Sequence, residues 1–253
     1  MAAPSSATTG DSFYDGAITL LQPARGYRVN VDALFLAAFA AEGRHARLAV
    51  DLGSGVGAVA LGLHHLGVVT RAALVEREPD LAELARANAL EASLVATVYE
   101  RDLSLGLPDD LAGRADLVVS NPPFFSVERG RPGAPGAKAR ARFGELGPFL
   151  DAAARAINGA RARVVFVYPA RELIGFCAAA QQVALIPKRL RLVHADGGAP
   201  ARVALIELQR AKPGGLVIEP PLFEWAEPGE RSPEVAAILR GEPATKARAN
   251  GRT

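Results

Sequence analysis

The residues best suited to chemistry are a glycine-rich turn and two acidic residues that follow it. The segment Asp51-Leu52-Gly53-Ser54-Gly55-Val56-Gly57 lies where a predicted strand ends and a predicted helix begins. Glycines at such a turn let the backbone approach a ligand, and free amides point toward it. Glu76 ends the next predicted strand, where a carboxylate can accept both hydroxyls of a ribose. Asp102 follows the third strand and is placed to hold an adenine amine, so these residues together predict a nucleoside-binding site.

The glycine-rich turn has three interpretations. A dinucleotide site uses G-x-G-x-x-G or A, which is satisfied by Gly53, Gly55 and Ala58. A methyltransferase nucleotide site uses D-x-G-x-G-x-G, which is satisfied by Asp51, Gly53, Gly55 and Gly57. The third interpretation is a strand-to-helix turn without a ligand. Asp51 favours the second, because its carboxylate would repel a pyrophosphate but suits an ammonium group. S-adenosylmethionine has an amino group and no phosphates.

A second candidate motif, Asn121-Pro122-Pro123-Phe124, directly follows the fourth predicted strand. In parallel sheets ligands lie beyond the carboxyl ends of the strands, so this turn faces the same crevice as the glycines. The prolines stiffen the turn and hold Asn121 extended. The amide oxygen of Asn121 and the carbonyl of Pro122 then offer two acceptors for the two N–H groups of an exocyclic amine. Phe124 offers a flat face to a planar substrate. The alternative is a turn with no chemical role.

In this combination the chain resembles class I S-adenosylmethionine-dependent methyltransferases that act on amines. The resemblance is strongest to the bacterial tRNA (adenine-N6) methyltransferases that modify a valine tRNA. The segment Arg25-Gly26-Tyr27-Arg28-Val29-Asn30-Val31-Asp32-Ala33-Leu34 is similar to their segment before the first helix, and Ala141-Arg142-Phe143 is similar to the residues after their catalytic turn. The resemblance spans residues 13–224.

The resemblance implies a fold and a set of roles. The fold is α/β and Rossmann-like, with a seven-stranded, mostly parallel sheet, helices on both faces and a C-terminal antiparallel hairpin. The catalytic residues implied are Asn121, Pro122, Pro123 and Phe124. The residues implied to bind S-adenosyl-L-methionine are Asp32, Asp51, Gly53, Ser54, Gly55, Gly57, Glu76, Arg77, Asp102, Leu103 and Asn121.

The apolar patterns along the chain lead to the same fold without the resemblance. Apolar runs predict strands at residues 47–51, 71–76, 96–101, 116–120, 163–168, 185–193 and 202–209. Helical periodicity predicts helices at 31–41, 56–65, 79–90, 149–157 and 171–182. This alternation is typical of a parallel sheet covered on both faces, and the last two strands must form an antiparallel hairpin. We expect a disordered leader at 1–12, a catalytic domain at 13–225, and a C-terminal extension at 226–253 with a disordered basic tail. We also expect a mobile loop at 130–138.

Positive charge is concentrated in two segments. Residues 128–142 carry a net charge of +4 and residues 240–253 carry +3, which leaves −5 for the rest of a chain whose total is +2. The first segment follows Phe124, so it predicts contact with RNA phosphates, tRNA above all. The residues expected to make these contacts are Arg129, Arg131, Lys138, Arg140 and Arg142. The alternative is a solvated linker.

Several classes of protein are excluded or disfavoured. A single cysteine, Cys177, excludes a disulfide scaffold and a Cys-rich zinc site, and the histidines lack partners at metal-ligand spacing. The single cysteine also predicts a reducing, intracellular setting, which we take as the cytoplasm. The absence of a long apolar run predicts no membrane span, and the first ten residues lack the pattern of a signal peptide. We expect a monomer. The alternatives to tRNA adenine are a protein glutamine, or another exocyclic amine in rRNA, DNA or a small molecule. A non-catalytic nucleic-acid-binding protein and a dehydrogenase also stay open.

Overall fold

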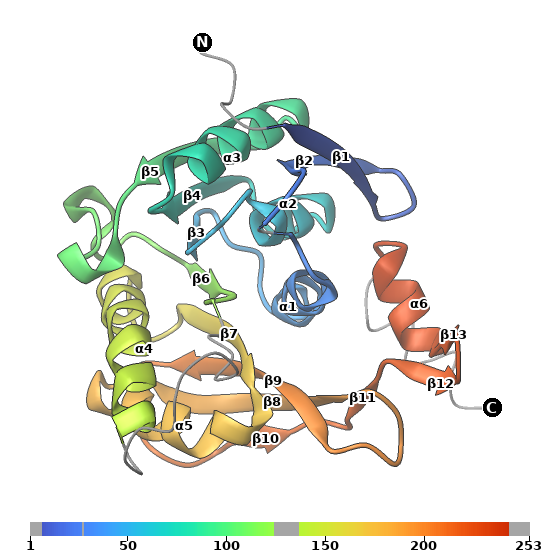
Figure 1. Ribbon diagram of the computed structural model, residues 1–253. Helices are drawn as coiled ribbons and strands as arrows, with labels where there is room; N and C mark the ends of the chain where they lie inside the picture. The colour runs from blue at the N-terminus through green and yellow to red at the C-terminus, as the bar shows by residue number, and fades with distance from the viewer. Residues whose placement is uncertain (1–6, 27, 124–136, 243–253) are drawn as a thin grey trace.

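The computed structural model describes residues 7–26, 28–123 and 137–242 (Figure 1). It contains a sheet flanked by helices, a separate hairpin near the N-terminus, and a small hairpin with a helix near the C-terminal end of the described chain. Expectations for residues 1–6, 27, 124–136 and 243–253 lie outside the described part.

The main sheet is the expected one with two short additions. Its seven long strands are β3 (Ala49–Leu52), β4 (Arg71–Glu76), β5 (Val95–Glu100), β6 (Leu117–Ser120), β7 (Arg163–Pro169), β8 (Ile186–His194) and β9 (Ala201–Gln209). They lie in the order β5-β4-β3-β6-β7-β9-β8, and only β9 is antiparallel to its neighbours. The strands β10 (Val217–Ile218) and β11 (Leu222–Phe223) pair in parallel with β8. The described sheet therefore has nine strands instead of the expected seven. The sequence did not predict β10 and β11, because a strand of two residues carries no detectable apolar pattern.

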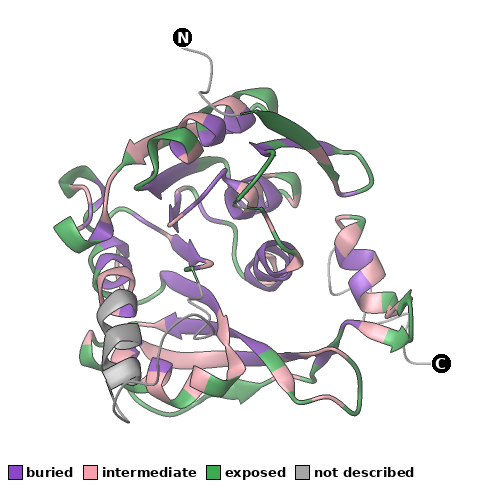
Figure 2. Ribbon diagram, in the orientation of Figure 1, coloured by how far each residue is buried: buried purple, intermediate pink, exposed green. Residues whose placement is uncertain are grey.

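Successive side chains of each strand point to opposite faces of the sheet, so each strand contributes to two apolar layers. Leu74 faces a core shared with α1 (Val31–Ala41), α2 (Ala58–His65) and α3 (Pro79–Glu91). Val75 faces a second core shared with α4 (Ala137–Ala156) and α5 (Leu173–Gln182). Figure 2 shows this buried interior between the helices and the sheet. The expectation of helices on both faces is confirmed.

The N-terminal segment differs from its expectation. Residues 8–12, expected in a disordered leader, belong to β1 (Thr8–Phe13), which pairs antiparallel with β2 (Ile18–Pro23). Residues 8–11 are exposed or half-exposed, so backbone pairing with β2, rather than burial, holds this strand. Asp11 adds an ion pair with Arg28 and accepts a hydrogen bond from Gln22 Nε2 at 2.6 Å. A strand held in this way leaves no apolar pattern in the sequence.

Two further segments are more ordered than expected. The helix α4 begins at Ala137 and continues through Pro148, whereas the sequence predicts a loop to residue 138 and a helix from 149. Gly147-Pro148 is typical of a helix boundary, but here the helix accommodates the proline. In the expected C-terminal extension, β12 (Trp225–Glu227) pairs with β13 (Glu230–Arg231), and α6 (Pro233–Leu239) follows. Val235 and Ile238 of α6 are buried in the core that contains α1.

Candidate functional site

The candidate site lies at the carboxyl edge of the sheet, where β3, β4 and β6 end side by side. Asp51 on β3 pairs with Leu74 on β4 and with Val119 on β6. The glycine-rich turn follows β3, Glu76 ends β4, and Asn121 follows β6. Because the three strands are parallel neighbours, the two motifs and the acidic residue meet at one edge, as the sequence predicts.

The glycine-rich turn has a backbone that requires glycine. Gly53, Gly55 and Gly57 have φ values of 67°, 55° and 90°, in the left-handed region that other residues rarely adopt. A Cβ atom at Gly53 would lie 2.8 Å from Phe149 on α4, so this turn is also packed against the helix. The amides of Gly53 and Ser54 donate to the carbonyl of Val75, at 2.8 and 3.1 Å. The expectation of free amides is therefore wrong at these two residues, because the end of β4 uses them.

Glu76 is the acceptor around which the turn is built. Its side chain is buried, and Oε2 accepts from the amide of Gly55 at 2.7 Å. Its Oε1 accepts from the amides of Arg77 and Glu78, at 2.8 and 2.9 Å. A carboxylate offers about four acceptor positions. Glu76 therefore holds the turn with three bonds and keeps one acceptor position, on Oε2, for a hydroxyl donor of a ligand.

Asp51 is buried beneath the same turn. Its Oδ2 accepts from the amide of Ala60, in the first turn of α2, at 3.3 Å. Burial is the main reason why the pKa of Asp51 is raised to about 7, with the nearby charge of Glu76 adding to it and the Ala60 bond opposing it. The residue is 1% exposed, and the positive N-terminal end of α2, which donates this hydrogen bond, stabilises its charged form.

The Asn-Pro-Pro turn is fixed to the glycine-rich turn by one buried hydrogen bond. The hydroxyl of Ser120, the last residue of β6, donates to the carbonyl of Leu52 at 2.8 Å. Ser120 immediately precedes Asn121, and Leu52 immediately precedes Gly53. Asn121 is half-buried. The sequence analysis missed Ser120, although a polar residue closing an apolar strand is a usable signal.

Asp32 lies at the start of α1 in an ion-pair network rather than as a free carboxylate. Arg202, at the start of β9, donates to its Oδ1 at 2.6 Å and to its Oδ2 at 3.0 Å. Arg202 also donates to Glu224 at 2.8 Å, and hydrogen bonds with Asp32 are the main reason why the pKa of Arg202 is raised. Asp32 is 2% exposed. The sequence analysis missed Arg202, which is 170 residues away from its partner.

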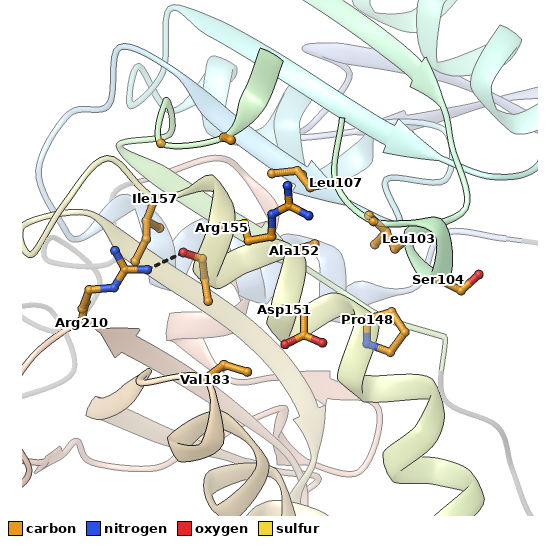
Figure 3. A pocket seen from close by; sticks show the side chains of 14 residues that line it. Leu103, Ser104, Leu107, Pro148, Asp151, Ala152, Arg155, Ile157, Val183 and Arg210 are labelled. Carbon is orange, nitrogen blue, oxygen red and sulfur yellow. Dashed lines mark hydrogen bonds between the residues drawn. The ribbon is translucent and has the colours of Figure 1, made fainter. Parts of the chain in front are cut away.

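The expected adenine-side residues lie on the loop after β5. Asp102 accepts from the amide of Ser104 at 2.8 Å, and the hydrogen bonds from Ser104 lower its pKa. Leu103 is buried, whereas Arg77 is exposed and forms an ion pair with Glu78. Leu103 and Ser104 also line a cavity of about 700 Å³ beside α4 (Figure 3).

The remaining expected residues can be placed only in part. Pro122 is buried and Pro123 is exposed. Phe124, Arg129 and Arg131 lie outside the described residues. The backbone of Lys138, Arg140 and Arg142 belongs to the first turns of α4, and their side chains lie outside the description. The expected RNA contacts of these residues stay predictions.

Sequence comparisons point to one kind of domain. Residues 30–132 match the methyltransferase small domain family. The chain is 38% identical over 108 residues to a tRNA1(Val) (adenine(37)-N6)-methyltransferase of Porphyromonas gingivalis, across 39% of this chain and 41% of that protein. It is 46% identical over 79 residues to a release factor glutamine methyltransferase of Mycolicibacterium smegmatis, across 30% of this chain and 27% of that protein. The chain thus spans less than half the length of the curated relatives that it matches.

Solved structures show the same fold at low sequence identity. A predicted O-methyltransferase of Agrobacterium tumefaciens superposes with a TM-score of 0.63 and 22% identity, covering 83% of this chain and 95% of that one. A 16S rRNA N2 methyltransferase of T. thermophilus, solved with S-adenosylmethionine and guanosine, gives a TM-score of 0.57 at 17% identity, covering 81% and 50%. The chain has the Rossmann-like methyltransferase fold that the sequence predicts.

S-adenosyl-L-methionine is the cofactor that this family and fold imply, and the residues at the carboxyl edge fit it. The hydroxyl of Ser54 is buried inside the glycine-rich turn and has no hydrogen-bond partner among the described residues. Glu76 and Asp51 add a carboxylate with spare acceptor capacity and a buried acid, which suit a ligand with hydroxyl donors and positive charge. In the part of the chain that is described, no three His, Cys, Asp or Glu side chains gather as a metal site. No described helix is long and apolar enough to cross a membrane.

Proposed function

Because residues 30–132 match the methyltransferase small domain family and the chain has this fold, we propose that it is an S-adenosylmethionine-dependent N-methyltransferase. We propose N6 of an adenine in tRNA as its target. The observation that carries the proposal is the Ser120–Leu52 hydrogen bond, which places the Asn-Pro-Pro turn directly beside the glycine-rich turn. Methyl donor and acceptor amine would then meet at one point of the sheet edge.

The cofactor would be held by the residues of the carboxyl edge. When bound, S-adenosylmethionine supplies an electrophilic methyl group on a positively charged sulfur. Glu76 would accept a ribose hydroxyl at the remaining acceptor position of Oε2, Ser54 would hydrogen-bond to the cofactor within the turn, and Asp102 with Leu103 would hold the adenine. Asp51 would favour the positive charge of the ligand from beneath. Asp32, held by Arg202, would bracket the methionine end.

Asn121 and Pro122 would orient the attacking amine. An exocyclic amine is a weak nucleophile, because its lone pair is delocalised into the ring. When the Asn121 amide oxygen and the Pro122 carbonyl accept its two hydrogens, the nitrogen is drawn toward tetrahedral geometry and the lone pair is localised for in-line attack. The hydrogen bonds strengthen as the nitrogen changes geometry, so they lower the barrier rather than only bind substrate. The proton that the product nitrogen carries leaves to water.

The relative from Porphyromonas gingivalis supports tRNA adenine as the target, and the basic residues from Arg129 to Arg142 support a polyanionic substrate. An enzyme of this kind would act as a monomer in the cytoplasm, where tRNA is found. The match to a release factor glutamine methyltransferase favours a second candidate, a protein glutamine, since its amide nitrogen presents the same two N–H groups.

Mass spectrometry of the nucleosides of the RNA and of the peptides of the release factor separates the two candidates. The purified chain is incubated with S-adenosylmethionine and either an unmodified valine tRNA transcript or a release factor. We expect N6-methyladenosine in the transcript, and none with Asn121→Ala. If only the release factor is methylated, the target is a protein glutamine and not an adenine in tRNA. Methylation of neither would reject both candidates.

A further inference from the structure

The exposed arginines of the molecule fall into two groups that differ in their partners. Several form an ion pair with an acidic neighbour, as Arg86 does with Glu100, Arg171 with Glu172 and Arg240 with Glu242. Arg25 and Arg210 are exposed without an ion pair among the described residues, each in a separate part of the chain. At the opposite edge of the sheet from the candidate site the pattern changes. Arg44, Arg71, Arg114 and Arg161 are exposed and form no ion pair among the described residues.

These four side chains start from adjacent points along the amino edge of the sheet. Arg71 begins β4, and the neighbouring residue Thr70 donates to the carbonyl of Arg47 at 3.3 Å. Arg114 precedes Ala115, which bridges to Ile157 shortly before Arg161. Arg44 is joined to the start of β7, where Arg163 Nη2 donates to its carbonyl at 3.0 Å.

The strands that carry this edge are neighbours in the order β4-β3-β6-β7 (Figure 1). With a strand spacing of about 4.8 Å, the arginines are spread over roughly 15 Å. We call Arg44, Arg71, Arg114 and Arg161 the amino-edge arginines. Arg47 lies among them, 85% exposed, with a long 3.5 Å contact to Asp116.

Helix dipoles do not explain these charges. The carboxyl ends of helices favour cations, but the effect falls off within the last turn. Arg44, Arg71 and Arg161 lie beyond the ends of α1 at Ala41, α2 at His65 and α4 at Ala156, and the last turn of α1 holds no basic residue. Adjacent unpaired cations repel one another and add nothing to the stability of the fold. A bound polyanion would make them favourable.

A cavity beside α4 lies between the two edges of the sheet, although none of the four amino-edge arginines lines it. The cavity of about 700 Å³ beside α4 is lined by Leu103 and Pro148 toward the carboxyl edge, and by Gly113 and Ile157 toward the amino edge. Figure 3 shows Arg155 and Arg210 along it, with Arg210 donating to the carbonyl of Ala154 at 2.6 Å. The basic first turns of α4 continue from the same helix. An RNA backbone that extends from the site to the amino edge would pass this cavity along α4.

We infer that the amino-edge arginines bind the phosphate backbone of the RNA substrate at a distance from the modified base. This inference rests on the proposed RNA substrate. The carboxyl edge itself is acidic, with Asp51, Glu76 and Asp102, so it repels phosphates and accepts a base and the cofactor. The RNA backbone is then held by the opposite edge, where the four amino-edge arginines form no ion pair among the described residues.

The test is RNA binding at several salt concentrations. The variant Arg71→Gln, Arg114→Gln, Arg161→Gln removes one cation from each of three strand ends. The matched control, Arg86→Gln, Arg171→Gln, Arg240→Gln, removes the same charge from paired positions. The probe is a fluorescein-labelled, unmodified valine tRNA transcript, followed by fluorescence anisotropy without cofactor. S-adenosylhomocysteine affinity and the melting temperature report whether each variant is folded.

We expect the amino-edge variant to lower the slope of log K against log salt by up to about 2, and to weaken binding up to roughly 100-fold at 0.1 M salt. The control should change the affinity a few-fold, and both variants should bind S-adenosylhomocysteine normally. Equal weakening by both variants, or an unchanged slope, would overturn the inference and leave the proposed reaction intact. If the unchanged protein binds S-adenosylhomocysteine but no RNA, both the inference and the RNA substrate fail, and the methyltransfer proposal stands.

Discussion

Glu76→Gln separates the two tasks that we assign to this carboxylate, holding the turn and binding a ribose. The side chain is nearly the same size, but it has one acceptor oxygen. That oxygen can keep the amides of Arg77 and Glu78, and the new NH₂ group then faces the amide of Gly55, which needs an acceptor. One charge-assisted bond at a buried residue is lost, so the free energy of unfolding should fall by about 1.5–3 kcal/mol. For a protein of this size that corresponds to a melting temperature lower by roughly 3–12 °C.

The same change should weaken cofactor binding. The carboxylate has one acceptor position left for a ribose hydroxyl, whereas in Glu76→Gln the amides of Arg77 and Glu78 fill both positions of the single oxygen. The loss of one charged hydrogen bond predicts a 10- to 100-fold weaker affinity for S-adenosylhomocysteine, to order of magnitude. Isothermal titration calorimetry measures the affinity, and differential scanning calorimetry measures the melting temperature.

The matched control is Glu78→Gln, which removes the same charge two residues away. Glu78 is exposed and its ion pair with Arg77 is exposed as well, so both quantities should change little. Wild-type affinity in Glu76→Gln would refute the ribose contact, even if stability falls. Equal losses in both variants would show that net charge, rather than the position of Glu76, governs binding.

Three other predictions concern the same edge. Asn121→Ala should lower kcat at least 100-fold while the affinity for S-adenosylhomocysteine stays within a few-fold. Near-normal kcat on the substrate that the wild-type protein methylates would reject the amine-orienting role. The folded pKa of Asp51, raised to about 7, lies above its unfolded value near 4, so the folded state binds the extra proton and the free energy of unfolding should fall as pH rises between the two. Urea unfolding from pH 4 to 8 measures this fall, which should be smaller in Asp51→Asn; an unchanged profile would contradict the assignment. Ser120→Ala breaks the bond to Leu52 and should cost about 1 kcal/mol of stability and reduce kcat more than cofactor affinity, whereas an unchanged kcat would show that the bond does not position Asn121.

The parts of the fold that bury apolar side chains were predictable from the sequence. The helix predicted at residues 31–41 is α1, and the strand predicted at 71–76 is β4, with the same bounds. Both carry strong apolar patterns that match their burial. The strand β1 was not predictable, because its stability comes from backbone pairing and polar contacts. The early part of α4 was missed because Gly147-Pro148 is typical of a boundary, whereas the helix continues through it.

The candidate site was predictable where it depends on strand order. The carboxyl ends of neighbouring parallel strands lie at the same edge of the sheet, so the sequence alone was enough to place Glu76 and Asn121 at one edge. What could not be predicted is which groups already have partners. The ion pair of Asp32 with Arg202, and the use of the Gly53 amide by Val75, depend on side-chain and backbone contacts across the sheet. Such contacts have no fixed spacing in the sequence.

The position of β9 has a consequence for how the chain is made. β7 pairs with β9 and not with β8, although β8 is synthesised first. Until residue 209 has left the ribosome, the nascent chain therefore carries β7 with one open edge, and Val165, Phe166 and Val167 lie on that strand. An unpaired, apolar strand edge is a site for pairing with other chains. The central sheet is closed only by its last long strand, so a chain cut short before β9 keeps most of the cofactor edge and yet is exposed to aggregation.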